Sequence, residues 1–391
     1  MDMKDSPADA EFRAEVRDWL ADHLVGEFAR HRGVGGPTDD EHWDLRLAWE
    51  HELADARLLN ISWPEEYGGR GGTVDQEIVF LQEHAAAAAP YWVGVQGRDL
   101  FGPTLLRHGT PAQKARFLPA ITRVEQFWGQ GFSEPGAGSD LAGLRTRAVR
   151  DGGEWVIDGQ KIWTTFGDTA DWLYVLCRTN PDVPKHRGIS MLLVPADQPG
   201  VDIRPIRNIV GSREFCEVFL TGARTAADLV VGGVEGGWKV AMGTVGAERL
   251  LTTLPYQYMF ARELRSLVDV LRDRGRTADP LVRQRLADAW IGLEVVRYTN
   301  LRMISTLTRT GDLGSESSVS KLQWATWHQR LGELSMQLLG PSAEIVGDGY
   351  ALDAFQRGFL NSRAETIYGG ANEIQRTILA ERALGLPKEP A

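Results

Sequence analysis

The spacing of apolar residues predicts helices at both ends of the chain and strands between them. Up to about residue 121, apolar residues recur every three or four positions, as at Phe12, Val16, Leu20 and Leu24. From about 124 to 233, short runs such as WLYVLC and ISMLLV alternate with Gly, Asp, Pro and Asn turns, which is typical of strands. The helical period then returns at 238–274, 280–309 and 317–339.

This pattern predicts an α+β fold with three domains. We expect an N-terminal helical domain at 1–122, a central β domain at 123–233 and a C-terminal helical domain at 234–391. Thr110, Pro111 and Gln113 have the pattern of a helix start, and Gly340 followed by Pro341 has that of a helix end. The five alanines at 85–89 favour a helix.

Composition excludes several classes of protein. The 391 residues exceed what one core usually holds, so several lobes are expected. The net charge of −10, with no run of Lys or Arg, argues against nucleic-acid partners. No apolar stretch is long enough to span a bilayer, and the acidic amino terminus lacks a signal-peptide core, so we expect a cytoplasmic protein without membrane partners.

The cysteines and histidines do not suggest a metal site. Cys177 and Cys216 each lie in a strand-like apolar run, so we interpret both as inert core residues. The eight histidines lack the spacing of a metal-binding motif. We therefore expect no bound metal and an organic cofactor.

Two segments have the composition of a ligand site. In SEPGAGSD (133–140), Gly136 and Gly138 allow backbone N–H groups to approach a ligand, and two serines supply hydroxyls. In GQKIWTT (159–165), Trp163 offers an aromatic wall and Thr165 a donor. A β-hairpin with a packed Trp is the alternative interpretation, and it explains less of the pattern.

Together with IYGGANEIQR (367–376) and WPEEYGG (63–69), these segments resemble the signatures of the acyl-CoA dehydrogenase family, over essentially the whole chain. The resemblance implies helical lobes around a β domain, a C-terminal four-helix bundle, FAD as cofactor and an acyl-CoA substrate. It also implies a tetramer with FAD at a subunit interface. The segment Gly102-Pro103-Thr104-Leu105 and the IYGGANEIQR ending further resemble the actinobacterial steroid-catabolic branch of the family, where mixed assemblies occur.

The resemblance also implies roles for individual residues. Predicted cofactor-binding positions are Phe132, Ser133, Gly138, Ser139, Trp163, Thr164, Thr165, Arg274, Gln337, Gly340, Ala371 and Glu373. Predicted substrate-binding positions are Ser139, Arg249, Tyr368, Gly369 and Gly370. Three positions depart from the family pattern, because Ala371 and Pro341 replace more usual residues and the sequence around Arg274 differs. Arg274, Gln337 and Gly340 would reach the flavin of a neighbouring subunit.

The catalytic base is displaced relative to many members of the family. These members carry a glutamate where this chain has Gly369, whereas a minority place it in an E-R-L setting, as at Glu248-Arg249-Leu250. The helical face of Glu248 has no other charged residue, and burial would raise the pKa of its carboxyl group toward the working pH. Alternatively, Glu248 is a solvated residue that pairs with Arg249 or Arg262. Pro255 predicts a helix kink just beyond it.

Asn372 and Gln375 have the pattern of a capping box that opens the last helix.

The predicted reaction is FAD-dependent α,β-dehydrogenation of an acyl-CoA thioester to a trans-2-enoyl-CoA. Glu248 would take the α proton, and the β hydrogen would pass to the flavin as hydride. An electron-transferring flavoprotein is the acceptor that the resemblance implies. Two alternatives are a flavin monooxygenase of the same fold and a subunit that completes the flavin site of a partner chain, so the assembly is either a homotetramer or a heterotetramer with a related subunit.

Overall fold

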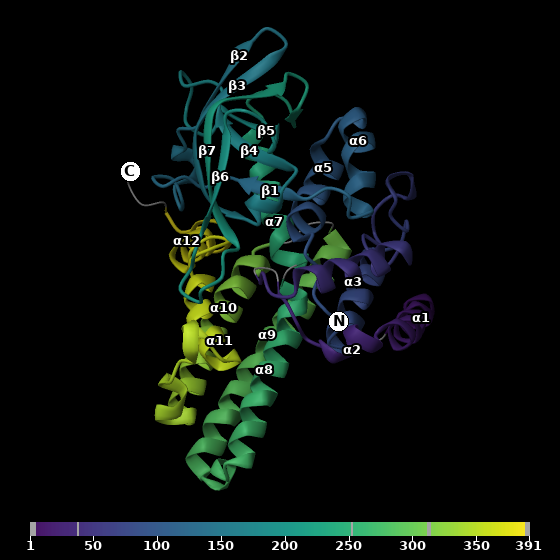
Figure 1. Ribbon diagram of the computed structural model, residues 1–391, viewed down its shortest axis with the longest axis vertical. Coiled ribbons are helices and arrows are strands. Elements are labelled where there is room, and N and C mark those ends of the chain that lie inside the picture. Colours follow the sequence, from purple (N-terminus) through teal and green to yellow (C-terminus); the bar gives the residue numbers. More distant parts are fainter. Residues whose placement is uncertain (1–4, 37–38, 252, 311–313, 388–391) are drawn as a thin grey trace. The chain divides into compact units, whose positions relative to one another are not determined.

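The computed structural model describes residues 5–36, 39–251, 253–310 and 314–387, and for 245–251, 253, 254 and 308 it describes the backbone only. The chain forms two compact units (Figure 1). The helical–β unit comprises Ser6–Asn208 and Ser212–Glu248. The carboxyl-terminal unit comprises Arg249–Ala391 together with Ile209–Gly211.

Helices form the first part of the helical–β unit. They are α1 (Pro7–His23), α2 (Gly26–Arg30), α3 (Trp43–Asp55), α4 (Val74–Ala86), α5 (Gly102–His108) and α6 (Pro111–Thr122). Phe12, Val16 and Leu20 are buried on one face of α1, which confirms the spacing argument. The capping box predicted at Thr110 and Gln113 is present at the start of α6.

The alanine tract differs from its prediction. Helix α4 ends at Ala86, and Ala88 has a left-handed φ of 54°. The Gly33 N–H donates to the Ala88 carbonyl oxygen at 2.6 Å, so this carbonyl does not continue a helix. The helix predicted through residue 89 is therefore wrong beyond Ala86, because the turn into the next segment overrides alanine's helix propensity.

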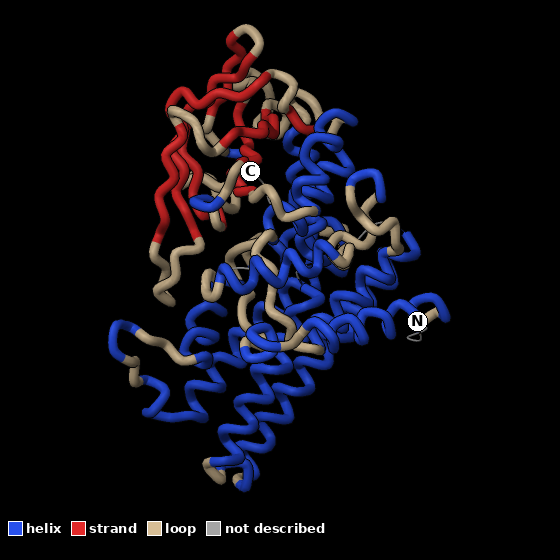
Figure 2. The backbone as a smooth tube through the Cα atoms, turned by 45° about the vertical axis from the view of Figure 1, so that its right-hand side comes forward, coloured by secondary structure: helices blue, strands red, loops and turns tan. Residues whose placement is uncertain are grey.

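The second part is a sheet of eight strands in the described residues (Figure 2, red). The strands are β1 (Trp128–Gly131), β2 (Arg147–Asp151), β3 (Glu154–Thr165), β4 (Trp172–Arg178), β5 (Ile189–Pro195), β6 (Val201–Ile206), β7 (Phe215–Ala226) and β8 (Val230–Val231). Their order is β6-β7-β3-β2-β4-β5-β8, and β1 pairs with β4 in parallel.

The central strand β4 is buried on both faces. Leu173, Val175 and Cys177 face one apolar cluster, whereas Tyr174 and Leu176 face another. Such two-sided burial explains why WLYVLC is a continuous apolar run rather than an alternating one. Cys177 and Cys216 are both buried and free, as predicted.

Helix α7 (Gly237–Leu251) follows the last strand and belongs to this unit up to Glu248. Its first half packs against α5. Val240 and Ala241 belong to the same apolar cluster as Leu105. The Thr104 and Thr244 hydroxyl groups are 2.8 Å apart and buried. A hydrogen bond between them therefore fixes α7 against α5.

The carboxyl-terminal unit is helical, and its helices up to Glu365 each pack on the next helix in the chain (Figure 1). Its α-helices are α8 (Thr253–Asp273), α9 (Pro280–Thr310), α10 (Glu316–Leu339), α11 (Ala354–Glu365) and α12 (Asn372–Ile378). Buried leucines from α8, α9 and α10 form the core. Helix α10 ends at Gly340, as predicted, with φ 70°.

The helix predicted across 238–274 is two helices. Helix α7 ends at Leu251 and α8 begins at Thr253, and Thr252 between them is outside the described residues. Pro255 therefore lies in the first turn of α8, where a missing N–H costs little, and not inside one continuous helix. In the described ranges, none of the helices has the length and apolar character needed to cross a membrane.

The close contact between α5 and Trp63 gives a test of packing. An added Cβ at Gly102 would lie 2.0 Å from Trp63 Cη2, in a buried cluster where the indole cannot move away. We expect Gly102→Ala to lower the free energy of unfolding by about 1–3 kcal/mol. Gly153→Ala is the matched control, because its added Cβ would meet nothing within 4 Å. Equal denaturant midpoints for the two variants would contradict the packing argument.

Candidate functional site

The turn at 133–140 has open space beside its two glycines. Glu134 and Ala137 exchange two backbone hydrogen bonds of 3.1 and 3.0 Å, which close the turn. An added Cβ at Gly136 or Gly138 would meet nothing within 4 Å. Packing inside the chain therefore does not require these glycines, and the open space fits a ligand that approaches the backbone.

A buried ion pair joins this turn to the WTT segment. The Lys161 ammonium donates to Glu134 Oε1 at 2.8 Å and to the Phe132 carbonyl oxygen at 3.1 Å. The Glu134 carboxylate also accepts backbone N–H groups of Arg145 (2.7 Å) and Thr146 (2.8 Å). The Lys161 side chain is fully buried. The two signature segments are therefore held in one fixed arrangement.

Burial and pairing shift the pKa of each partner. Burial raises the pKa of Glu134, but the Lys161 charge and the N–H donors outweigh it, so the net pKa is below the ordinary value. Burial lowers the pKa of Lys161, against the opposing effect of Glu134. Nearby, burial raises the pKa of the Cys177 thiol to about 12, so it is inert at neutral pH. Neither Glu134 nor Lys161 was predicted from the sequence as a site residue, although each lies inside a quoted motif.

Trp163 is displayed by a β-bulge. In the pairing of β3 with β7, Lys161 opposes Val218 and Thr164 opposes Cys216, so two residues of β3 face one of β7. Trp163 has a left-handed φ of 64° and is 55% exposed. A large aromatic residue rarely adopts this conformation, and such strain concentrates at ligand sites. The bulge thus leaves the indole exposed.

The remaining residues predicted for this part of the site lie on or beside β1 and β3. The Ile162 N–H donates to the Ser133 carbonyl oxygen at 3.0 Å, which brings the two segments together. Phe132 is buried and Ser139 is exposed on the turn. Thr164 is fully buried and pairs with Cys216 of β7, and its hydroxyl donates to the Gln130 carbonyl oxygen at 3.1 Å. Thr165 is half-buried at the end of β3.

These residues fit a flavin cofactor. The buried Gln130 amide nitrogen has no hydrogen-bond partner among the described residues. It belongs to the strand that leads into Phe132 and Ser133. An orphaned donor, an exposed indole and an open glycine turn are the features that an aromatic, phosphate-bearing cofactor requires.

In the carboxyl-terminal unit, three of the predicted substrate positions, Tyr368, Gly369 and Gly370, form a turn after α11. Gly369 and Gly370 have left-handed φ angles of 63° and 93°. The Gln375 amide nitrogen donates to both of their carbonyl oxygens at 3.3 Å. The Tyr368 N–H donates to the Ala364 carbonyl oxygen at 3.0 Å, which attaches the turn to the end of α11.

The predicted capping box at Asn372 and Gln375 is wrong. Ala371 is the N-cap of α12, and no side chain caps the helix. The Asn372 N–H donates to the Thr366 carbonyl oxygen at 3.0 Å, so it does not need the Gln375 side chain. The Gln375 side chain reaches the preceding turn instead. Ala371 is half-buried and the Glu373 side chain is exposed.

Arg274, Gln337 and Gly340 come together in this unit. The Arg274 guanidinium donates to the Leu339 carbonyl oxygen at 3.3 Å and to Ser342 Oγ at 3.2 Å, on either side of Gly340. Gln337 accepts a hydrogen bond from Arg285. Arg274 is therefore adjacent to the segment with which it was grouped from the sequence.

The predicted base lies on α7. The backbones of Glu248 and Arg249 are helical, and their side chains are outside the described part of the structure. One turn earlier, Thr244 is fully buried and is held by Thr104. The helix that carries Glu248 is therefore anchored one turn before it.

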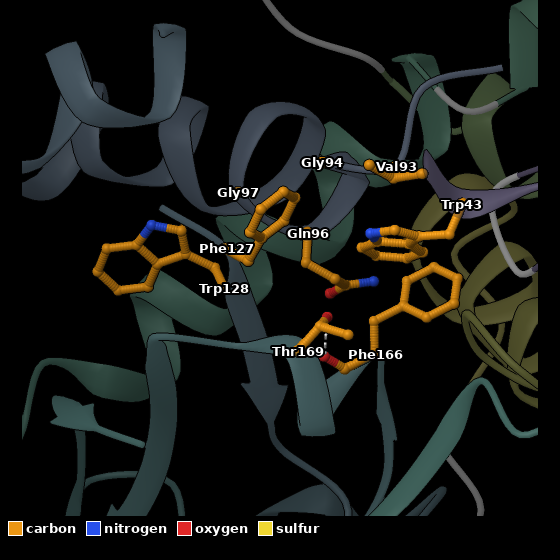
Figure 3. Close-up of a pocket in the computed structure, with 9 residues that line it drawn as sticks. All are labelled: Trp43, Val93, Gly94, Gln96, Gly97, Phe127, Trp128, Phe166 and Thr169. Carbon is orange, nitrogen blue, oxygen red and sulfur yellow. Dashed lines mark hydrogen bonds between the residues drawn. The ribbon is translucent and has the colours of Figure 1, made fainter. Parts of the chain in front are cut away.

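A small pocket lies between the helices and the sheet of the helical–β unit (Figure 3). The Gln96 amide points toward Phe166 and Trp43, and its oxygen accepts the Tyr174 hydroxyl at 3.1 Å. Gln96 begins a π-helical stretch, Gln96–Phe101, a form that is frequent near functional sites. This pocket was not predicted from the sequence.

Comparison with known proteins defines the class. Family models match the acyl-CoA dehydrogenase N-terminal domain at residues 6–125, the middle domain at 129–223 and the C-terminal domain at 235–384. The chain therefore belongs to the acyl-CoA dehydrogenase family, an oxidoreductase and flavoprotein family, with the predicted α+β fold.

Individual relatives indicate which branch of the family this chain resembles. The chain is 50% identical over 382 residues to the acyl-CoA dehydrogenase IpdE1 of Mycobacterium tuberculosis, covering 97% of this chain and 98% of IpdE1. It is 48% identical to IpdE1 of Mycolicibacterium smegmatis, with 97% and 98% covered. The solved Tcur3481-Tcur3483 steroid acyl-CoA dehydrogenase superposes with a TM-score of 0.86 at 32% identity over 100% of each chain. These similarities support the steroid branch of the family.

The buried ion pair can be tested by removing one charge. Lys161→Met leaves the Glu134 carboxylate buried without its counter-ion, so we expect a loss of about 3–5 kcal/mol in the free energy of unfolding. The double variant Glu134→Gln/Lys161→Met should lose less, because no unpaired charge remains buried and the amide oxygen of glutamine still accepts one of the two N–H groups of Arg145 and Thr146. Denaturant unfolding measures both. A double variant as unstable as the single one would contradict the charge argument.

The pair also predicts a pH dependence. Because the pKa of Glu134 is lowered in the folded state, its stabilisation is present above its ordinary pKa of 4.5 and is lost as the pH falls through the folded value. The advantage in unfolding free energy of the parent over Glu134→Gln should be constant near neutral pH and shrink below about 4.5. An advantage that persists undiminished to pH 2 would show that the carboxylate charge is not the source.

Proposed function

We propose that this protein dehydrogenates an acyl-CoA thioester between its α and β carbons, giving a trans-2-enoyl-CoA, with FAD as cofactor. The observation that carries this proposal is the display of Trp163 on a strained bulge, tied by the Lys161–Glu134 pair to an open glycine turn. This arrangement has a flat aromatic surface beside free backbone donors, which suits a flavin. Family membership supports the reaction type.

The residues proposed to bind FAD are those that the resemblance to the family implies. Phe132, Ser133, Gly138, Ser139 and the 163–165 segment belong to the helical–β unit, and Ala371 and Glu373 belong to the carboxyl-terminal unit. Arg274, Gln337 and Gly340 would complete the site of a neighbouring subunit. When bound, FAD supplies the acceptor for the β hydrogen, which leaves as hydride.

The protein's own groups perform the proton chemistry. Glu248 is proposed to accept the α proton, and the Gly369 N–H to donate a hydrogen bond to the thioester carbonyl oxygen, which stabilises the negative charge that develops there. The C–H electrons left at the α carbon form the new double bond as the β hydride departs. Ser139, Arg249, Tyr368 and Gly370 are proposed to contact the acyl-CoA.

We propose a bulky, steroid-derived acyl group as the substrate. Gly369 and Gly370 have no side chains, so the turn leaves room where many members of the family carry a glutamate. The similarity to the Tcur3481-Tcur3483 steroid acyl-CoA dehydrogenase supports this class of substrate. Electron-transferring flavoprotein is the proposed acceptor, and the cytoplasm the proposed location.

The assembly is proposed to be a heterotetramer with a related subunit. The ChsE4-ChsE5 complex of Mycobacterium tuberculosis, a complex of two differently named chains, superposes with a TM-score of 0.82 at 29% identity over 100% of each chain. Helix α9 also exposes apolar side chains at Ile291, Val295 and Tyr298, which lie along one helical face and suit a subunit interface. FAD content of the chain alone, compared with that after mixing with such a partner, distinguishes this assembly from a homotetramer.

Replacing Glu248 tests the proposed function. Glu248→Gln keeps size and hydrogen bonding but accepts no proton, so FAD content and acyl-CoA binding should survive while flavin reduction slows by roughly 10⁴-fold. The measurement is anaerobic flavin bleaching on rapid mixing with straight, branched and steroid acyl-CoAs. Glu52→Gln, at an exposed position on α3, is the control and should match the parent.

Two outcomes would count against the proposal. A parent that no acyl-CoA bleaches would contradict the dehydrogenase function and favour the monooxygenase alternative, or a subunit that only completes a partner's site. A Glu248→Gln variant that bleaches within about tenfold of the parent would mean that another group is the base.

A further inference from the structure

A buried charge network lies in the carboxyl-terminal unit, outside the proposed cofactor and substrate positions. His328 on α10 has both ring nitrogens against carboxylates, with Nδ1 2.7 Å from Glu365 Oε2 on α11 and Nε2 2.7 Å from Glu263 Oε2 on α8. Because a carboxylate only accepts, both nitrogens must donate and the ring is an imidazolium. The opposed carboxylates raise the pKa of His328 to about 10 despite the lowering effect of burial.

A second cation of α10 reaches the same residue of α11. The Lys321 ammonium donates to the Glu365 backbone carbonyl oxygen, and it lies 5.3 Å from the centre of the Tyr368 ring and 4.8 Å from that of Trp324. Glu365 is thus held through its side chain by His328 and through its backbone by Lys321. The network contains two carboxylates and two cations, so its charge is balanced.

The helices around this network approach closely because of two glycines. An added Cβ at Gly358 would lie 2.5 Å from Glu263 Oε1, and one at Gly332 would lie 2.8 Å from the Phe359 Cα. His328 also stacks on Phe260 at 4.1 Å. The end of α11 is therefore fixed against both α8 and α10.

The turn that follows Glu365 needs such an anchor. Gly369 and Gly370 are the residues with the least intrinsic conformational restriction, so local sterics do not fix the direction of the Gly369 N–H. The turn is attached to α11 by the Tyr368 N–H and to α12 by Gln375. The hydrogen bond from the Tyr368 N–H to α11 can fix the turn only if the end of α11, at Glu365, is itself held in place.

We propose that His328 is a positioning residue, which acts through Glu365 to hold the Tyr368–Gly370 turn so that the Gly369 N–H is aimed at the thioester carbonyl. This inference rests on the proposed function for its catalytic meaning, although the mechanical link does not depend on it. This chain has Gly369 where many members of the family carry a glutamate, so no side chain at this position restricts the backbone. Contacts from α10 to the end of α11 supply that restriction instead.

The mechanical link can be tested without substrate or cofactor. In the full chain, His328→Gln and Glu365→Gln should each speed amide hydrogen exchange of residues 366–371 by roughly tenfold, because the C-terminal end of α11 loses its anchor. Leu293→Ala, a core change on α9 that contributes no group to the network, is the control for general destabilisation. Equal acceleration in the control, or no acceleration in either network variant, would overturn the link.

The catalytic meaning is tested on the FAD-loaded protein with the acyl-CoA that bleaches the parent fastest. Flavin reduction should fall by roughly 10²-fold in His328→Gln with little change in acyl-CoA affinity, since a small misplacement of an oriented group has this cost. The infrared band of the bound thioester carbonyl should return toward its position in water. An unchanged rate and band would overturn the positioning role. A parent without bleaching would refute the proposed function alone, because the exchange result stands independently.

Discussion

The hydrogen-bonded ion pair between Lys161 and Glu134 is the interaction on which the helical–β part of the proposed site depends. Two charges out of water are costly unless each is paired and hydrogen-bonded, and here the chain supplies two acceptors for the ammonium and two backbone N–H donors for the carboxylate. The pair fixes the glycine turn relative to β3. The turn and the indole are therefore already in place before any ligand arrives, which reduces the ordering that binding must supply.

The two units contribute different kinds of group. The helical–β unit contributes an aromatic face, hydroxyls and free backbone, whereas the carboxyl-terminal unit contributes a glycine turn whose support is a set of buried charges. In each unit, a buried charged pair or network holds in place the segment that is proposed to contact a ligand. The residues proposed to make that contact are themselves uncharged on the Gly369–Gly370 turn and on the bulge, apart from the backbone dipoles.

Much of the fold could be predicted from the sequence, because the apolar periods of 2 and 3.6 reflect the burial of one or two faces. The strand runs and the cap at Thr110 were confirmed for this reason. Two of the failures came from competing hydrogen bonds. Ala88 turns because a distant N–H takes its carbonyl oxygen, and Gln375 serves the preceding turn because the Asn372 N–H is already bonded to Thr366.

The candidate site was predictable as a set of segments but not as geometry. The motifs indicated Trp163, yet nothing in the letters IWTT shows that two residues oppose one of β7 or that the indole is exposed. Likewise, the charges of Glu134 and Lys161 stand 27 positions apart, so their pairing depends on the fold. His328 was missed because its two carboxylate partners come from helices far away in sequence.

The bulge at Trp163 also sets the phase of strand β3. In a regular strand, residues three apart face opposite sides, yet Lys161 and Thr164 are both fully buried. The extra residue shifts the alternation by one position, so inward-facing residues have odd numbers before the bulge, as at Lys161, and even numbers after it, as at Thr164. This stretch of the chain therefore cannot gain or lose one residue as a surface loop can. A deletion that straightened the strand would turn one of its two buried polar side chains, the ammonium or the hydroxyl, to the opposite face.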